Sequence, residues 1–169
     1  MGTIHLVFGP QGAGKSTYAR QLAARQNALR LSIDEWMGSL YGPDLPKPLD
    51  LAWVTERVQR CERQIWATAA EAARCGTEIV LDLGFMKTAS RSAFVSLAWN
   101  ANHAVRLHHV TAPQAIRRER VLARNEERGE TFSFEVTPQM FEFMEAQFEA
   151  PTPEELSHAL LIESHREAA

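Results

Sequence analysis

A glycine-rich stretch near the start of the sequence has the pattern of a phosphate-binding loop. Residues 8–17 read FGPQGAGKST, and residues 9–16, called the glycine loop below, fit G-x-x-x-x-G-K-[ST] in full. Glycines allow backbone N–H groups to turn inward and approach a phosphate without a clash from a Cβ atom. The lysine of such a loop supplies charge to the β- and γ-phosphates, and the hydroxyl after it can hold Mg²⁺. The stretch therefore predicts a site for ATP and Mg²⁺.

The residue types on either side of the loop support this interpretation. An apolar run precedes it, and the sequence after it favours a helix, whose N-terminus attracts the same anion. An ordinary turn between a strand and a helix would not explain Lys15 followed by Ser16, and the other two lysines, Lys47 and Lys87, lie in predicted loops. The residues expected to contact the nucleotide here are Gly9, Pro10, Gln11, Gly12, Ala13, Gly14, Lys15, Ser16 and Thr17.

Two aspartates follow later apolar runs. Asp82 ends EIVLD, a form in which the carboxylate holds Mg²⁺ together with the loop hydroxyl, here Ser16. Asp34 ends LRLSID, where a carboxylate can accept the proton of a hydroxyl that attacks the γ-phosphate. Aspartate is also a favoured helix N-cap residue, so these residues alone leave two roles open for Asp34.

A stripe of arginines forms the remaining candidate chemistry. The spacing 3, 4 and 4 places them on one face of a helix: Arg117, Arg120, Arg124 and Arg128. Arg124 and Arg128 are expected to clamp phosphates as a following loop closes, because the guanidinium fork binds phosphate oxygens in pairs. Arg120 is a further candidate for nucleotide contact, whereas Arg117 is expected at the surface. The alternative is a solvated charged face, neutralised by Glu119, Glu126 and Glu127.

The elements that must position these groups alternate between strand and helix. Strands are expected at 3–8, 29–34, 77–84, 104–112 and 158–164, and helices at 15–26, 51–76, 88–102, 114–127 and 137–149. Such alternation indicates an α/β fold with a mostly parallel sheet. Ligands of these sheets bind at the carboxyl ends of the strands, where the glycine loop, Asp34 and Asp82 are all expected. We expect one domain over 1–169, with a lid at about 124–137.

Composition excludes several classes. Net charge is −3, so no strongly basic nucleic-acid surface is expected. No apolar run approaches about 18 residues, and the N-terminus lacks the basic region of a signal peptide. The cysteines, Cys61 and Cys75, form no metal-binding pattern and are expected to be free thiols. A cytoplasmic protein with no membrane contact is expected.

The strings GPQGAGKST, SIDEW, IVLDLGF and RVLARNEERG, in this order, resemble the P-loop kinases grouped with phage-type polynucleotide kinase, zeta toxins and chloramphenicol phosphotransferase. The resemblance covers roughly residues 3–162. It implies a three-layer P-loop NTPase fold with a five-stranded parallel sheet, ATP with Mg²⁺, and phosphoryl transfer to a hydroxyl. It assigns phosphate binding to Lys15 and Ser16, the general base to Asp34, and the lid arginines to Arg124 and Arg128.

The sequence departs from this family where the polynucleotide kinases hold the nucleic-acid phosphate. An arginine stands there three residues after the base aspartate, and here that residue is Met37. Nearby aromatic residues (Trp36, Tyr41 and Trp53) either line a pocket for a small, partly apolar alcohol or pack in the core. A small-molecule acceptor with a hydroxyl is therefore favoured. The alternatives are a polynucleotide 5′-hydroxyl kinase, a zeta-toxin-like nucleotide-sugar kinase, and an ATP-binding switch that acts through a protein partner.

Overall fold

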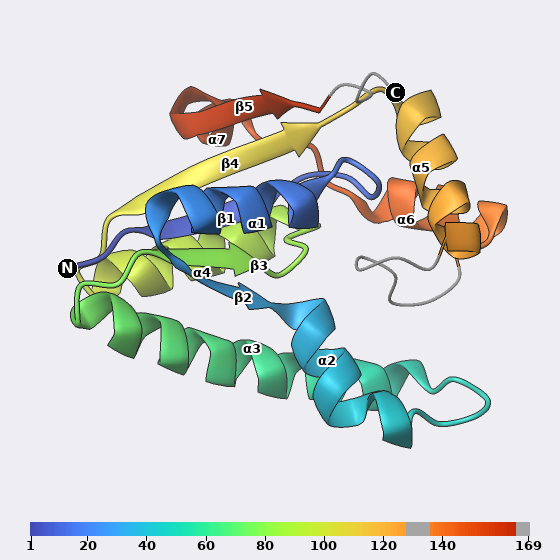
Figure 1. Ribbon diagram of the computed structural model, residues 1–169, viewed down its shortest axis with the longest axis horizontal. Coiled ribbons are helices and arrows are strands. Elements are labelled where there is room, and N and C mark those ends of the chain that lie inside the picture. The colour runs from blue at the N-terminus through green and yellow to red at the C-terminus, as the bar shows by residue number, and fades with distance from the viewer. Residues whose placement is uncertain (128–135, 165–169) are drawn as a thin grey trace.

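The architecture is a parallel sheet between two layers of helices (Figure 1). The structure, a computed structural model, describes residues 1–127 and 136–164. The sheet has the order β2-β3-β1-β4-β5, and every neighbouring pair is parallel. Its strands are β1 (Ile4–Phe8), β2 (Leu29–Ser32), β3 (Ile79–Asp82), β4 (Val105–Thr111) and β5 (Ala159–Glu163). The expected five-stranded parallel sheet is confirmed.

The helices lie on the two faces of the sheet and at its ends. α1 (Lys15–Gln26) covers one face, where its residues pack on Val7, Val80 and Val110. α3 (Leu51–Arg74) and α4 (Thr88–Asn100) cover the other face. The other helices are α2 (Ile33–Tyr41), the 3-10 turn η1 (Gly42–Asp44), α5 (Gln114–Glu127), α6 (Pro138–Gln147) and α7 (Pro153–His158). In Figure 1, α5 and α6 lie beyond the carboxyl ends of the strands, the end of the sheet at which α2 follows β2.

The central strand carries the core. Every residue of β1 is buried, as expected for a strand with neighbours on both sides and helices on both faces. Ile4, Leu6 and Phe8 point to the α3 and α4 layer, where Ile65 and Phe94 meet them. Because β1 is so firmly held, the glycine loop that follows it starts from a fixed position. No helix in the described ranges is long and apolar enough to span a membrane.

The structure corrects the expected elements at two places. The second strand ends at Ser32, not at residue 34, and helix α2 begins at Ile33 without being expected. Ser32 is the reason, because its Oγ accepts a hydrogen bond from the backbone N–H of Glu35 and caps the helix. Helix α7 was also unexpected, and it starts with a capping box between Thr152 and Glu155.

Candidate functional site

The glycine loop makes a tight turn between β1 and α1. Gly9 lies so close to β4 that a Cβ atom there would stand 2.0 Å from the carbonyl oxygen of Val110. Gly14 is the residue before α1 and has the left-handed conformation, with φ of 91°, which costs little only for glycine. These two positions explain why the loop needs glycine at its first and last glycine sites. The helix then presents its N-terminus, with Lys15 and Ser16 in the first turn.

Lys15 lies among both acidic and basic groups. Its Nζ donates to the carbonyl oxygen of Pro10 at 2.9 Å, within the loop itself. Burial, with a smaller contribution from the positive charges of Arg117 and Arg124, lowers the pKa of Lys15 to about 8, while the charges of Asp82 and Asp34 oppose the shift. The lysine therefore lies within electrostatic reach of both candidate aspartates. A phosphate bound at this loop would favour the charged ammonium.

Asp34 is placed by helix α2 rather than by the end of a strand. It lies in the first turn of α2, and Ser32 occupies the cap position, so the alternative role of Asp34 as the helix cap is wrong. Surrounding protein raises the pKa of the Asp34 carboxyl, and repulsion from Asp82 adds to this, while Lys15 and Arg124 act in the opposite direction. The residue's own surface is open to solvent. A carboxyl with a raised pKa and open access suits a proton acceptor.

Asp82 is the last residue of β3 and is only 5% exposed. Its Oδ2 accepts a hydrogen bond from Nη1 of Arg30 at 3.2 Å. In the sheet register Asp82 stands beside Ser32, so the end of β3 lies next to the start of α2. This partner of Asp82 was not expected, because Arg30 has no chemical signal in the sequence beyond its position on a strand.

The donor set of this region fits Mg²⁺ only in combination with a nucleotide. A carboxylate, Asp82, and a hydroxyl, Ser16, supply the oxygen ligands that Mg²⁺ prefers. Among residues 1–127 and 136–164 no three side chains of the His, Cys, Asp and Glu types gather into a metal site. Phosphate and water oxygens would complete the coordination, as is usual for Mg²⁺ at nucleotide sites.

Of the two arginines expected to clamp phosphates, Arg124 lies in the part of the chain that the structure describes, in helix α5. Its side chain is half-buried, and its buried Nε has no hydrogen-bond partner within the described part of the chain. Burial lowers the pKa of Arg124, and the charge of Asp34 opposes this, so α5 brings the guanidinium within electrostatic reach of Asp34 and Lys15. An arginine with an unused buried donor suits an anionic ligand. Arg128, the second expected clamp, lies outside the described residues.

The other two arginines of the stripe contact protein groups. The expectation that Arg117 lies at the surface is wrong, since only 5% of it is exposed. Its guanidinium donates to Gln11 O at 3.2 Å, to Ala112 O at 2.9 Å, and to both carboxylate oxygens of Glu145. The spacing of arginines along α5 could not reveal this, because Glu145 comes from α6. Arg117 therefore supports the glycine loop through its hydrogen bond to the Gln11 carbonyl oxygen.

Arg120 reaches the glycine loop through a serine. Its Nη1 donates to Ser164 Oγ at 2.8 Å, and that hydroxyl donates to Ala13 O at 2.6 Å. Ser164 directly follows β5, and its backbone N–H bonds to Thr111 O. Sequence reasoning missed Ser164, which carries no motif. Direct contact between Arg120 and a nucleotide stays a prediction.

The aromatic residues near Asp34 mostly pack against other side chains of the protein. Trp36, Met37 and Tyr41 of α2 are half-buried against the core under α3. The rings of Tyr41 and Trp53 meet edge to face at 6.1 Å, which joins α2 to α3. These contacts fix α2 on the sheet and so fix Asp34.

Arg91 makes a structural contact in the core. It is fully buried, pairs with Glu155 at 2.5 Å and lies over the ring of Phe8. Its further donors reach backbone oxygens at Phe85 and Glu149. Its role is to hold α4, α7 and the loop after β3 together.

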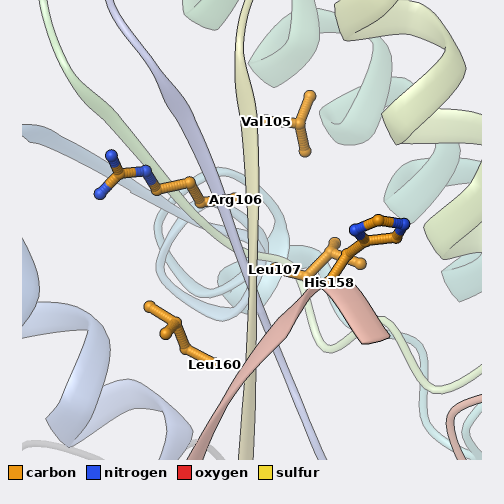
Figure 2. A pocket seen from close by; sticks show the side chains of 5 residues that line it. All are labelled: Val105, Arg106, Leu107, His158 and Leu160. Carbon is orange, nitrogen blue, oxygen red and sulfur yellow. The ribbon is translucent and has the colours of Figure 1, made fainter. Parts of the chain in front are cut away.

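A hollow of about 240 Å³ lies away from this site (Figure 2). It is lined by Val105, Arg106, Leu107, His158 and Leu160, at the amino ends of β4 and β5. Figure 2 shows the side chains of Arg106 and His158 extending in different directions, on opposite sides of β4. They do not converge on one ligand, so the glycine loop at the carboxyl ends is the candidate site.

Comparison with protein-family models gives a match over most of the chain. The family model of the AAA domain AAA_33 matches residues 4–151. No curated protein sequence matches the chain significantly.

Solved structures share the fold at low sequence identity. A proposed kinase from Chloroflexus aurantiacus superposes with a TM-score of 0.76 at 17% identity, over 96% of this chain and 88% of that one. The APS kinase of Mycobacterium tuberculosis, solved with AMPPNP and APS, superposes with a TM-score of 0.66 at 16% identity, over 98% of this chain and 90% of that one. A gluconokinase from Sinorhizobium meliloti superposes with a TM-score of 0.63 at 14% identity, over 96% of this chain and 82% of that one. The chain has the fold of the P-loop kinases.

Proposed function

Because the chain belongs to the AAA domain family AAA_33, we propose that it is an ATP-dependent phosphotransferase. It would move the γ-phosphoryl group of ATP to a hydroxyl of a small-molecule acceptor. One observation carries the proposal: Lys15 in the first turn of α1, Asp34 in the first turn of α2 and Arg124 of α5 come within electrostatic reach of one another at the carboxyl edge of the sheet, so that the charges of Asp34 and Arg124 act on Lys15 and those of Lys15 and Arg124 act on Asp34. A purely structural glycine turn would not gather a lysine, a carboxyl and an arginine there.

Each residue has a role in this reaction. Asp34 takes the proton of the acceptor hydroxyl, and the oxygen forms a bond to the γ-phosphorus. The bond from that phosphorus to the β–γ bridging oxygen breaks, and ADP leaves with the electron pair. Lys15 and Arg124 neutralise the charge spread over the transferring group. Ser16 and Asp82 would hold Mg²⁺, which supplies positive charge to the phosphate oxygens when it is bound.

The nucleotide part of the proposal has support from the fold. The structurally similar APS kinase was solved with AMPPNP, an ATP analogue. In this chain the loop after β1, the N-terminus of α1 and Lys15 supply the donors that a triphosphate requires. Arg128 stays a second predicted clamp.

The acceptor is proposed from the surroundings of Asp34. Met37, and not an arginine, stands three residues after Asp34, and Leu45 and Leu49 of the following segment are exposed apolar residues. Apolar surroundings favour a small, partly apolar alcohol over a polyanionic nucleic-acid strand. A polynucleotide end and a nucleotide sugar are the alternative acceptors.

The experiment is transfer from γ-labelled ATP with Mg²⁺ to a panel of acceptors, with Asp34→Asn as the control. The panel holds small alcohols, antibiotics, nucleosides, nucleotide sugars and 5′-hydroxyl oligonucleotides. A labelled product that Asp34→Asn fails to make supports the proposal and identifies the acceptor class. Normal transfer by Asp34→Asn would contradict the assignment of the base. ATP hydrolysis that rises only with a protein partner, without a labelled product, would favour a regulatory switch.

A further inference from the structure

Four charged side chains of alternating sign connect α1, which follows the glycine loop, with α2, which carries Asp34, and with the end of β3. Arg20 of α1 pairs with Glu35 of α2 at 3.3 Å, and Glu35 also pairs with Arg30 of β2. Arg30 in turn reaches Asp82 of β3 at 3.2 Å. Arg30 therefore joins β2 to α2 and β3, and α1 is joined to them through Glu35.

The burial of these groups makes Arg30 the important member. Its side chain is 13% exposed and that of Asp82 is 5% exposed, whereas Glu35 is 51% exposed. A surface pair contributes little, but the loss of one partner from a buried pair leaves a charge without compensation. Removal of Arg30 would thus leave the Asp82 carboxylate beside Asp34 and Lys15 with one fewer positive neighbour.

Guanidinium geometry explains why arginine stands at this position. Nη1 of Arg30 bonds to Asp82 and Nη2 bonds to Glu35, so one planar group holds two carboxylates of different elements. A lysine has a single nitrogen and cannot hold both in fixed directions. Glu35 is the neighbour of Asp34 in the first turn of α2. The fork of Arg30 therefore fixes both the Asp82 carboxyl and the turn that carries Asp34.

We propose that Arg30 is a positioning residue of the candidate site, which orients and neutralises Asp82 and holds the first turn of α2 through Glu35. The effect of Arg30 on catalysis rests on the proposed function. The effect of Arg30 on ATP binding does not rest on it, because ATP binding requires no acceptor.

The first arm of the test is calorimetric binding of ATP in EDTA, using Arg30→Gln, Asp82→Asn and the double variant. In Arg30→Gln the Asp82 charge repels ATP, so ATP affinity should fall about tenfold. In the Asp82→Asn background the same change should alter ATP affinity less than about threefold. An equal loss in both backgrounds would overturn the proposal, because Arg30 would then not act through Asp82.

The second arm measures phosphoryl transfer on any acceptor that the panel provides. Arg30→Gln should lower kcat about tenfold or more, with the KM for ATP with Mg²⁺ within about threefold of the wild type. Arg30→Lys should recover only part of this loss, and Glu35→Gln should lower kcat without altering ATP affinity in EDTA. An unchanged kcat in both Arg30→Gln and Glu35→Gln would overturn the positioning role.

Controls separate this role from simple destabilisation and from failure of the proposed function. Arg74→Gln, at the exposed end of α3, removes an arginine whose pair with Glu71 spans 4.0 Å. This variant should change neither ATP affinity in EDTA nor kcat. All variants are compared below the lowest melting temperature, and a loss of stability with unchanged kcat and ATP affinity would assign Arg30 a merely structural role. If no acceptor is phosphorylated by the wild type, the proposed function fails, while the calorimetric cycle still decides the link between Arg30 and Asp82.

Discussion

Nδ1 of His5 lies 2.9 Å from Nε2 of His108, between the adjacent strands β1 and β4. The chain of hydrogen bonds extends on both sides, from Nε2 of His5 to Glu78 at 3.1 Å and from Nδ1 of His108 to the hydroxyl of Tyr18 at 2.8 Å. Because the Glu78 carboxylate only accepts, neutral rings must donate through Nε2 and accept through Nδ1. The Tyr18 hydroxyl donates at the far end, so every bond in the chain is satisfied when both histidines are neutral.

This chain predicts a loss of stability in mild acid. Burial and the charge of Arg106 lower the pKa of both histidines, although Glu78 opposes the shift of His5; for His108 the charge of His5 also contributes, and its pKa falls to about 4. The unfolded chain, with a histidine pKa of about 6.5, then binds more protons than the folded chain between pH 6.5 and pH 4. The free energy of unfolding should be highest above pH 6.5, where the histidines are neutral in both states, and should fall by about 3 kcal/mol by pH 4. Urea titrations at several pH values measure it.

The control for this prediction is His108→Gln, which keeps a polar side chain without a titrating ring. The variant should be less stable at pH 7.5 but should lose less stability between pH 6.5 and pH 4. Glu78, whose pKa the bonds to Thr3 and His5 lower, adds acid sensitivity only below its ordinary range near 4.5. An unchanged slope in His108→Gln would show that the acid sensitivity arises elsewhere. Arg25, which lies over the ring of Tyr18, is unchanged in this comparison.

ATP affinity should depend on pH through Lys15. With a pKa of about 8 in the free protein, the lysine loses its charge as the pH rises above 8, and phosphate binding then requires a proton from solvent. Affinity for ATP should fall above pH 8 by up to about tenfold per pH unit, and calorimetry in buffers of different ionisation enthalpy should record proton uptake. Lys15→Arg keeps its charge and should give a flatter profile. A wild-type affinity that stays constant from pH 7 to pH 9.5 would contradict the prediction.

Substitution of Arg117 should damage the glycine loop. Arg117→Met leaves the Glu145 carboxylate unpaired and removes the donor to Gln11 O, so the free energy of unfolding should fall by about 3 kcal/mol and ATP affinity should also decrease. Arg118→Met is the matched control, since its contact with Glu142 is 3.9 Å long and exposed, and should change stability by less than about 0.5 kcal/mol. Equal stability of the two variants would argue against the supporting role of Arg117.

The close approach of the glycine loop to β4 can be tested with alanine. Gly9→Ala places a Cβ 2.0 Å from the Val110 carbonyl oxygen and should destabilise the fold by about 3 kcal/mol, because that oxygen belongs to the backbone of β4 and cannot rotate away as a flexible side chain could. Gly38→Ala, in the interior of α2, meets nothing within 4 Å and should stabilise the protein by about 0.5–1 kcal/mol. Chemical denaturation of both variants measures the contrast, and a neutral Gly9→Ala would contradict the geometry.

Local patterns predicted the parts of the site that lie next to regular elements. The strand before Lys15, the helix after it and the strand before Asp82 follow from apolar runs and a glycine turn, and the structure has them. Helix α2 was missed because a short strand reads directly into it, and only the Ser32 cap marks the change. The environments of Arg117 and Arg30 could not be predicted, since their partners Glu145 and Asp82 are distant in sequence.

The hydrogen bond from Ser164 to the carbonyl oxygen of Ala13 has a consequence for the order in which the protein is made. Ala13 leaves the ribosome early, but the group that holds its carbonyl follows β5, which must first pair with β4. During synthesis the glycine loop therefore exists without this support until nearly the whole described chain has emerged. Capture of nascent chains on immobilised ATP would consequently report completed synthesis of the sheet rather than the appearance of the loop.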